Sequence, residues 1–586
     1  MGRTKQSILG RLKSNEQTMM AVLALIVGLS GGFGAVAFRY LINFVQKISY
    51  GSDADLIEII PLLPWSQWVW LPTLGGLVVG PLVYFLAKEA KGHGVPEVME
   101  AVALKSGLIR KRIFVIKSLA SAVCIGTGGS VGREGPIVQI GSGIGSTIGQ
   151  ILKISADRRR TLVGCGAAAG IAATFNAPIA GSMFALEIIL GDFGLATFSP
   201  IVISSVAATV VSRHFLGDTP AFIVPAYELI SAWEFPLYVI LGGFCALVAM
   251  AFIDLLYRFE DLFDSLKFPD YLKASLGGIL LGAIGAFFPH VLGVGYGSID
   301  LSLMQMISWW LMLILILCKI LATAITIGSG GSGGIFAPSL FMGTMAGGFF
   351  GFIVHTLFPG FTATAGAYSI VGMGAVVSAT TYGPLTAILM LFEMTGDYKI
   401  ILPLMMTCIV SSALIRQLTA GSIYTLKLTR KGIDIKAGKE VNILKSIGVS
   451  EVMNVEPETL SEGIGMGKLA DRISKSKYSS FPVINGQNEL TGMLSFLDYH
   501  DAVFDEDLRD LVVVKDIATS QLITVSIDEN IFDALEKISV HDFSILPVVS
   551  GNDNRKLLGI LTRRDIIAAY NKALIKKSLF NRQGID

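Results

Sequence analysis

The chain has 586 residues, of which 52% are apolar and only 16% are charged, whereas ordinary soluble domains carry about 25% charged residues. Together with a mean hydropathy of +0.64, this composition excludes an ordinary soluble protein and indicates a protein embedded in a membrane. The formal net charge of +1 gives no sign of a nucleic-acid partner. Glycine accounts for 65 residues, which suits close helix packing and helices that break within a membrane.

The start of the chain is polar, and no short apolar run ends in a cleavage-like site, so we expect no cleavable signal. Four basic residues precede the first apolar segment: Arg3, Lys5, Arg11 and Lys13. Basic residues beside the first span favour the cytoplasmic side. The sequence therefore predicts a multi-pass protein of the cell membrane (plasma or inner), with a cytoplasmic N-terminus.

Apolar segments follow one another through the first three quarters of the chain. They lie at about 19–48, 69–88, 111–126, 160–190, 198–215, 236–257, 274–293, 308–327, 336–359 and 383–419. Several are too short or too interrupted by glycine for a simple span of about 20 residues. Short, broken segments that recur in both halves are typical of inverted-repeat transporters. We therefore predict an all-α membrane domain over residues 1–430 with an internal inverted repeat.

Two glycine-framed turns precede helix-length apolar runs: 132–136 (Gly-Arg-Glu-Gly-Pro) and 333–338 (Gly-Gly-Ile-Phe-Ala-Pro). Each predicts a helix N-terminus at membrane depth, where unpaired N–H groups and a partial positive charge bind anions. A dehydrated anion needs many weak donors, because a buried lysine or arginine would trap it. The first turn also carries Glu134, whose carboxylate can compete with the anion. These turns indicate an anion-conducting membrane protein.

The composition changes near Leu426, and two similar blocks follow at 448–505 and 513–572. Short β-branched runs alternate with amphipathic helices such as Ile531–Val540, so each block is predicted to be a small α/β unit. The second block has the slightly longer hairpin turn, at 551–554.

Four motifs, in this order, resemble those of the CLC family of chloride channels and chloride/proton antiporters: 92–96 (Gly-His-Gly-Val-Pro), 132–136, 333–338 and Tyr424. The resemblance covers nearly the whole membrane part, and the two C-terminal blocks resemble a tandem pair of CBS domains. It implies a CLC fold, a homodimer with one pore per subunit, chloride or a related small anion as substrate, and cytoplasmic CBS domains.

The resemblance also implies roles for single residues. The N–H groups of Ile335 and Phe336 and the hydroxyl of Tyr424 hold a central anion, while Glu134 is the gate and outer proton-transfer group, with a second anion site around it. The implied anion-binding residues are His93, Gly94, Arg133, Glu134, Gly135, Ile335, Phe336 and Tyr424. The alternatives are close helix packing for the glycines and a solvated helix start for Glu134.

Two positions depart from the family pattern. His93 stands where many relatives carry a serine that contacts the central anion, so its imidazole can donate, titrate near neutral pH or simply pack. Glu187 matches a family-wide acid, but Ile188 stands where well-known antiporters carry the inner proton-transfer glutamate. Because isoleucine carries no proton, the sequence slightly favours a passive chloride channel gated by Glu134. A chloride/proton antiporter is the alternative, since other antiporters lack that acid and water can substitute.

In the soluble blocks, a hydroxyl and a carboxylate recur at equivalent places, as Ser495 with Asp498 and Thr562 with Asp565. They match the CBS pattern that contacts the phosphates and ribose of an adenine nucleotide. A helix N-cap with an acid three residues later explains the same residues equally well.

Other functional classes have less support. A CBS-regulated cation transporter would line its path with several carboxylates, but the membrane acids are dispersed: Glu97, Glu100, Glu134, Glu187, Glu393 and Asp397. No catalytic constellation indicates an enzyme, and no required cofactor is expected. The six histidines lack metal-ligand spacing, so no metal is expected. The GxGxxG match at 328–333 is interpreted as a hinge before the anion-site helix.

Overall fold

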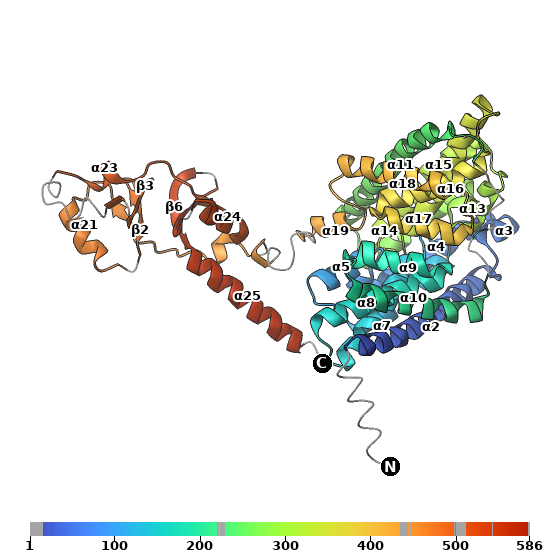
Figure 1. Cartoon of the computed structure of the whole chain (residues 1–586), viewed down its shortest axis with the longest axis horizontal. Coiled ribbons are helices and arrows are strands. Elements are labelled where there is room, and N and C mark those ends of the chain that lie inside the picture. The colour runs from blue at the N-terminus through green and yellow to red at the C-terminus, as the bar shows by residue number, and fades with distance from the viewer. Residues whose placement is uncertain are drawn as a thin grey trace, which may run out of the picture. The chain divides into compact units, whose positions relative to one another are not determined.

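The computed structural model describes residues 16–583, apart from 219–221, 223–228, 434–442, 446, 477, 497, 500–510, 542 and 552. The chain forms two compact units, which join in sequence at Lys431–Gly432 (Figure 1). Parts of three predictions lie outside the described residues: the basic N-terminal residues Arg3, Lys5, Arg11 and Lys13, the end of the first block at 500–505, and Asn552 of the predicted hairpin turn.

The first half of the membrane unit combines long helices with short broken ones. Its helices are α2 (Glu16–Tyr50), α4 (Trp65–Pro81), α5 (Val95–Ala103), α6 (Lys111–Gly126), α7 (Glu134–Ile151), α8 (Ala156–Phe175), α9 (Pro178–Phe184) and α10 (Leu195–Leu216). Short elements between them are α3 (Leu56–Ile59), η1 (Ile60–Leu62), η2 (Leu82–Leu86), η3 (Lys88–Ala90) and η4 (Ala185–Leu190).

The second half repeats the same order of long and short helices. Its helices are α11 (Glu234–Ser265), α12 (Asp270–Phe287), α13 (Tyr296–Leu303), α14 (Trp309–Gly328), α15 (Phe336–Leu357), α16 (Ala365–Thr381), α17 (Pro384–Thr395) and α18 (Ile401–Leu418), with η5 (Pro289–Val291) between α12 and α13. The short helix α19 (Thr425–Arg430) ends the unit. This repetition confirms the predicted internal repeat of broken helices.

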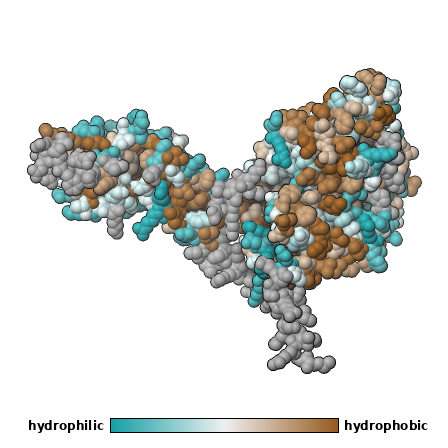
Figure 2. All heavy atoms as spheres, viewed as in Figure 1, coloured by the Kyte–Doolittle hydropathy of each residue, from teal (hydrophilic) through white to brown (hydrophobic). Residues whose placement is uncertain are grey.

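Length and composition agree with a membrane location. Among the described residues, seven helices are long and apolar enough to cross a membrane, whereas α16, α17 and the pair α9–η4 are apolar but shorter. The apolar segment at 160–190 contains α8, α9 and η4, and the segment at 383–419 contains α17 and α18. Figure 2 shows apolar side chains over much of the visible face of the membrane unit, as a surface in contact with lipid requires.

The two halves pack their central helices in the same way. Helices α7 and α8 cross where Gly141 meets Gly166, and α15 and α16 cross where Gly343 meets Gly372. A Cβ atom on either glycine of a pair would collide with the carbonyl oxygen of the other. These crossings therefore need glycine, because only a bare backbone permits so close an approach.

The halves also bind each other through two glutamates. Glu187 in η4 accepts the N–H of Thr386 in the first turn of α17, at 2.7 Å from its Oε2. Glu393 on α17 accepts the N–H of Ala180 in the first turn of α9, also at 2.7 Å from its Oε2. Each carboxylate thus satisfies free N–H groups at the start of a helix in the other half.

The C-terminal unit contains two three-stranded sheets of the same topology. The first has strands β1 (Leu460–Ser461), β2 (Ser480–Ile484) and β3 (Leu490–Ser495), and the second has β4 (Val525–Ser526), β5 (Ile545–Ser550) and β6 (Asp553–Thr562). In each sheet, the first pair is parallel and the second is antiparallel. The helices are α21 (Met466–Ile473), α23 (Val514–Ile517), α24 (Ile531–His541) and α25 (Arg563–Gln583), with η6 (Val449–Glu451) before the first strand.

The two sheets exchange their leading segments. Val449, which precedes the first sheet in sequence, is buried in the core of the second sheet, and its N–H bonds to the carbonyl of Glu529 at 2.9 Å. Val514, which precedes the second sheet, is buried in the core of the first, and its N–H bonds to the carbonyl of Ile464 at 2.9 Å. Each apolar core is therefore completed by a segment from the other block.

Candidate anion site

The two glycine turns lie against each other in the buried interior of the membrane unit. Gly132 and Gly334 exchange backbone hydrogen bonds, with N···O distances of 2.7 and 2.5 Å. A Cβ atom on Gly334 would lie 2.7 Å from the nitrogen of Gly135, so a side chain has no room. Helix α7 begins at Glu134 and α15 begins at Phe336. The structure thus confirms that each predicted turn starts a helix.

Glu134 lies at the first turn of both helices and is only 1% exposed. Its Oε2 accepts the N–H of Ala337, in the first turn of α15, at 3.4 Å. Its Oε1 accepts the hydroxyl of Tyr296, at the start of α13, at 2.9 Å. The carboxylate therefore occupies an N–H donor of α15 that would otherwise be free to bind an anion. A solvated helix start is wrong for this residue, because its side chain is buried.

A second cluster contains His93 and Tyr424, which come from the loop before α5 and the turn before α19. Their ring centroids lie 5.8 Å apart, and both residues are 2% exposed. The Nδ1 atom of His93 has no hydrogen-bond partner among the described residues. Beside them, Glu97 and Lys427 form an ion pair at 2.9 Å whose side chains are nearly buried.

The remaining predicted anion-site residues belong to the same helix ends. Ile335 is the N-cap of α15, and both it and Phe336 are 1% exposed. Gly94 is the N-cap of α5, with φ of 81°. Arg133 directs its guanidinium over the ring of Tyr296, at 5.1 Å from the ring centroid. Four separate helix starts therefore supply all the predicted residues of the membrane unit.

A buried lysine that the sequence did not single out holds the His93 loop. Lys117 on α6 donates to the carbonyl oxygens of Ala90 and Gly92, at 3.0 and 2.6 Å. The hydroxyl of Ser332, from the turn before α15, also donates to Ala90, at 3.0 Å. The ammonium group therefore bonds to backbone carbonyls and fixes the shape of the loop.

The second half uses the same arrangement. Lys319 on α14 donates to the carbonyl oxygens of Val291 and Gly293, at 3.0 and 3.1 Å. The hydroxyl of Ser130, from the turn before α7, donates to Val291 at 2.7 Å. The loop held by Lys319 leads directly into Tyr296. The sequence contained a sign of this second loop, because Gly293 and Gly295 have the same spacing as Gly92 and Gly94, which flank His93.

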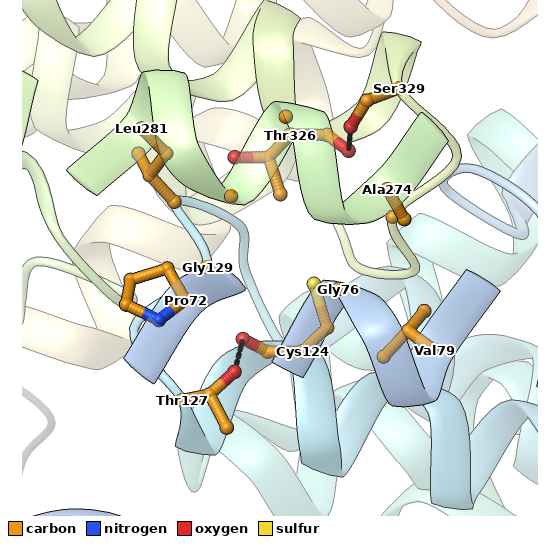
Figure 3. A pocket seen from close by; sticks show the side chains of 13 residues that line it. Pro72, Gly76, Val79, Cys124, Thr127, Gly129, Ala274, Leu281, Thr326 and Ser329 are labelled. Carbon is orange, nitrogen blue, oxygen red and sulfur yellow. Dashed lines mark hydrogen bonds between the residues drawn. The ribbon is translucent and has the colours of Figure 1, made fainter. Parts of the chain in front are cut away.

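The C-terminal ends of α6 and α14 are also equivalent in the two halves. Both border a small, mainly apolar cavity (Figure 3). The hydroxyl of Thr127 donates to the carbonyl of Cys124 at 3.3 Å, and the hydroxyl of Ser329 donates to the carbonyl of Thr326 at 3.2 Å. The cavity is lined by residues of both halves.

Glu187 and Ile188 have structural surroundings that bear on proton movement. Ile188 is buried, at 6% exposure. Both oxygens of Glu187 accept N–H groups at the start of α17, from Leu385 at 3.2 Å and Thr386 at 2.7 Å. Glu187 is therefore engaged as a helix cap, a role that the sequence did not predict.

In the C-terminal unit, the recurring hydroxyl and carboxylate bond to each other. The hydroxyls of Ser495 and Thr562 each donate to Oδ2 of the acid three residues later, Asp498 and Asp565, at 2.6 Å. The same Oδ2 atoms accept the backbone N–H groups of Ser495 at 2.7 Å and Thr562 at 3.0 Å. This is the geometry of a helix cap. Within the described part of the chain, no group of acids, histidines and cysteines could hold a metal ion.

Comparison with known protein families agrees with this geometry. The model of the voltage gated chloride channel family matches residues 75–416, and the CBS domain model matches residues 449–505 and 514–572. The first match covers more than half of the chain. The chain belongs to the CLC family.

This CLC protein is similar to curated bacterial relatives over its membrane part. It is 36% identical over 419 residues to a putative chloride channel protein, ClcB-like, of Ralstonia nicotianae, covering 71% of this chain and 98% of the relative. It is 33% identical over 430 residues to the H+/Cl− exchange transporter ClcA of Salmonella agona, covering 72% of this chain and 90% of the relative.

Solved structures show the same CLC fold. The crystal structure of a slow cyanobacterial Cl−/H+ antiporter matches with a TM-score of 0.64 and 28% identity, over 70% of this chain and 97% of the other. A eukaryotic CLC transporter matches with a TM-score of 0.61 and 19% identity, over 93% of this chain and 97% of the other, which shows the fold alone.

The paired lysines of this CLC protein give a first test. Lys117→Met removes a buried ammonium from two carbonyl oxygens, and we expect it to lower the free energy of unfolding by about 2 kcal/mol. The midpoint of thermal unfolding in detergent measures this. The control is Lys105→Met, because Lys105 is 53% exposed in its pair with Glu100 and exposed pairs contribute little. Equal midpoints for the two variants would contradict a structural role for Lys117.

Proposed function

We propose that this CLC protein exchanges chloride for protons, with Glu134 as the group that carries the proton and excludes the anion. The observation that supports this proposal is the place of the Glu134 carboxylate, whose Oε2 accepts the N–H of Ala337 at 3.4 Å. An ionised carboxylate at the start of α15 resembles a bound anion in charge and in hydrogen bonding. Carboxylate and chloride therefore compete for the same donors.

This competition links the two substrates. When Glu134 takes a proton, its attraction to the helix end falls and an anion can replace it. When the anion leaves, the ionised carboxylate can return. Because protonation of Glu134 and binding of the anion are coupled at one site, a gradient of either substrate can drive the other. A single buried glutamate thus supplies the basis of exchange.

The relatives favour exchange over passive conduction. One curated relative and one solved structure are described as H+/Cl− exchangers, while another relative is described as a putative chloride channel protein. A passive chloride channel gated by Glu134 is the second candidate, and Ile188 supports it. For exchange, water has to carry the proton past Ile188, because the oxygens of Glu187 are engaged at the start of α17.

The proposed anion path uses the residues at the four helix starts. We propose that the N–H groups of Ile335 and Phe336 and the hydroxyl of Tyr424 hold a central anion. The N–H groups beside Glu134 hold an outer anion once the carboxylate has left. His93 lies against Tyr424 and has a free ring nitrogen within the described structure, so it can donate an N–H to the central anion and influence selectivity. Gly94, Arg133 and Gly135 complete this proposed set.

Exchange can be tested with purified protein in liposomes. We expect an imposed chloride gradient to move protons against their own gradient, which a pH electrode in the external solution detects. In Glu134→Gln, we expect chloride flux to persist while proton movement disappears, because an amide cannot take up the proton. A protonophore should abolish the wild-type pH change.

Two results would overturn this reading. Chloride flux without proton movement in the wild-type protein would favour the passive channel. Proton movement that persists in Glu134→Gln would remove Glu134 from the proton path.

We further propose that residues 1–430 transport the anion and that residues 448–505 and 513–572 are cytoplasmic CBS domains that bind an adenine nucleotide. Ser495, Asp498, Thr562 and Asp565 are the candidate contacts, although each carboxylate already accepts the hydroxyl and the N–H of its own serine or threonine. We expect calorimetry with full-length protein to detect ATP binding and Asp565→Asn to weaken it. Asp471→Asn, at an exposed position of α21, is the control, and equal affinities in both variants would contradict this assignment.

We also propose a homodimer, by analogy with the family. Light scattering of the purified protein in detergent should give about twice the mass of one chain once detergent is subtracted. A mass equal to one chain would contradict the proposal.

A further inference from the structure

Tyr296 makes a contact with the proposed gate that none of the sequence motifs indicated. Its hydroxyl donates to Glu134 Oε1 at 2.9 Å, while Glu134 Oε2 accepts the N–H of Ala337 at 3.4 Å. The two oxygens of the carboxylate are therefore held by two helices, α13 and α15. A hydrogen bond to a charged oxygen is stronger than one between neutral groups, so the hydroxyl favours the place that the ionised carboxylate holds here.

The ring of Tyr296 is fixed from several sides. The guanidinium of Arg133 lies over it at 5.1 Å from the ring centroid, and the ring of Phe222 meets it edge-on with centroids 5.3 Å apart. The preceding loop turns through Gly293 and Gly295, whose φ values are 60° and 89°. Lys319 holds that loop by its carbonyl groups. These contacts of the ring and of the preceding loop therefore hold the Tyr296 hydroxyl in position to donate to Glu134.

The first half of the protein shows that the fold does not require this hydroxyl. There the equivalent loop turns through Gly92 and Gly94, both with φ of 81°, and is held by Lys117. The residue that begins α5, in the place that Tyr296 has in α13, is Val95. The same backbone arrangement forms with an aliphatic side chain. The tyrosine is therefore not needed to form this turn. It occurs in the second half, where its hydroxyl contacts Glu134.

We propose that Tyr296 is a positioning residue for the gate: its hydroxyl holds the Glu134 carboxylate on the Ala337 N–H of α15 and so opposes anion entry. This inference rests on the proposed role of Glu134. It predicts that Tyr296 influences anion binding only through the carboxylate. Without the hydroxyl, the carboxylate competes less well, and chloride binds more tightly.

Calorimetric titration of purified full-length protein with chloride tests the inference. We expect Tyr296→Phe to lower the apparent Kd for chloride by about tenfold or more, the effect of one hydrogen bond to a charged group. In a Glu134→Gln background, we expect the same substitution to change the Kd by less than about twofold, since no charged competitor remains. Faster chloride efflux from liposomes should accompany the tighter binding.

A second tyrosine provides a matched control. The hydroxyl of Tyr368 donates to a buried carboxylate, Glu234 Oε2, at 3.3 Å, away from the two glycine turns. Tyr368→Phe removes the same chemical group from the same kind of bond, and we expect no change in chloride affinity. A change as large as that of Tyr296→Phe would assign the effect to general loosening of the protein and would overturn the inference.

The outcomes separate this inference from the proposed gate. If Glu134→Gln alone leaves chloride affinity unchanged, the carboxylate does not compete and the proposed function fails. If Glu134→Gln tightens chloride binding but Tyr296→Phe does not, the gate stands and the role of Tyr296 is wrong. An equal effect of Tyr296→Phe with and without the carboxylate would also overturn it, because the tyrosine would then act on the anion directly.

Discussion

The mutual backbone hydrogen bonds of Gly132 and Gly334 bring the starts of α7 and α15 to one point inside the membrane unit. Helix starts carry partial positive charge, and two that converge in a medium of low dielectric constant repel each other unless a negative group lies near both. In this structure, that group is the carboxylate of Glu134. The need for negative charge is thus a property of the fold itself. Transport follows if a mobile anion can replace the carboxylate as the negative group near both helix starts.

Both halves of the protein provide hydrogen-bond donors for a buried glycine loop in the same way. A loop with two left-handed glycines leads into each of the short helices α5 and α13, and its inward carbonyl groups need donors. Lys117 and Lys319 supply them. A buried ammonium was expected to trap a passing anion, yet these lysines bond to backbone oxygens and leave the anion to weaker donors. One loop then presents His93 to Tyr424, and the other presents Tyr296 to Glu134.

The sequence predicted the elements that depend on local chemistry. The glycine turns located the starts of α7 and α15, the recurrence of broken segments indicated the repeat, and the C-terminal blocks folded as small α/β units. It did not predict the contact of Tyr296 with Glu134, which joins residues 162 positions apart. The caps formed by Glu187 and Glu393 were missed for the same reason. Such contacts follow from how the two halves interlock, and no local pattern encodes that geometry.

The exchange of leading segments in the C-terminal unit has a consequence for how the chain is made. The core of the first sheet includes Val514, which leaves the ribosome only after all three strands of that sheet. Val449 is synthesised early, but its partners in the second core come about a hundred residues later. The first core can close only after Val514 has emerged, and Val449 stays without its core until the second sheet is made, so the nascent chain exposes apolar surface until the last strand emerges. A premature stop between the blocks would therefore leave the first core without Val514 and would leave Val449 without the core that buries it.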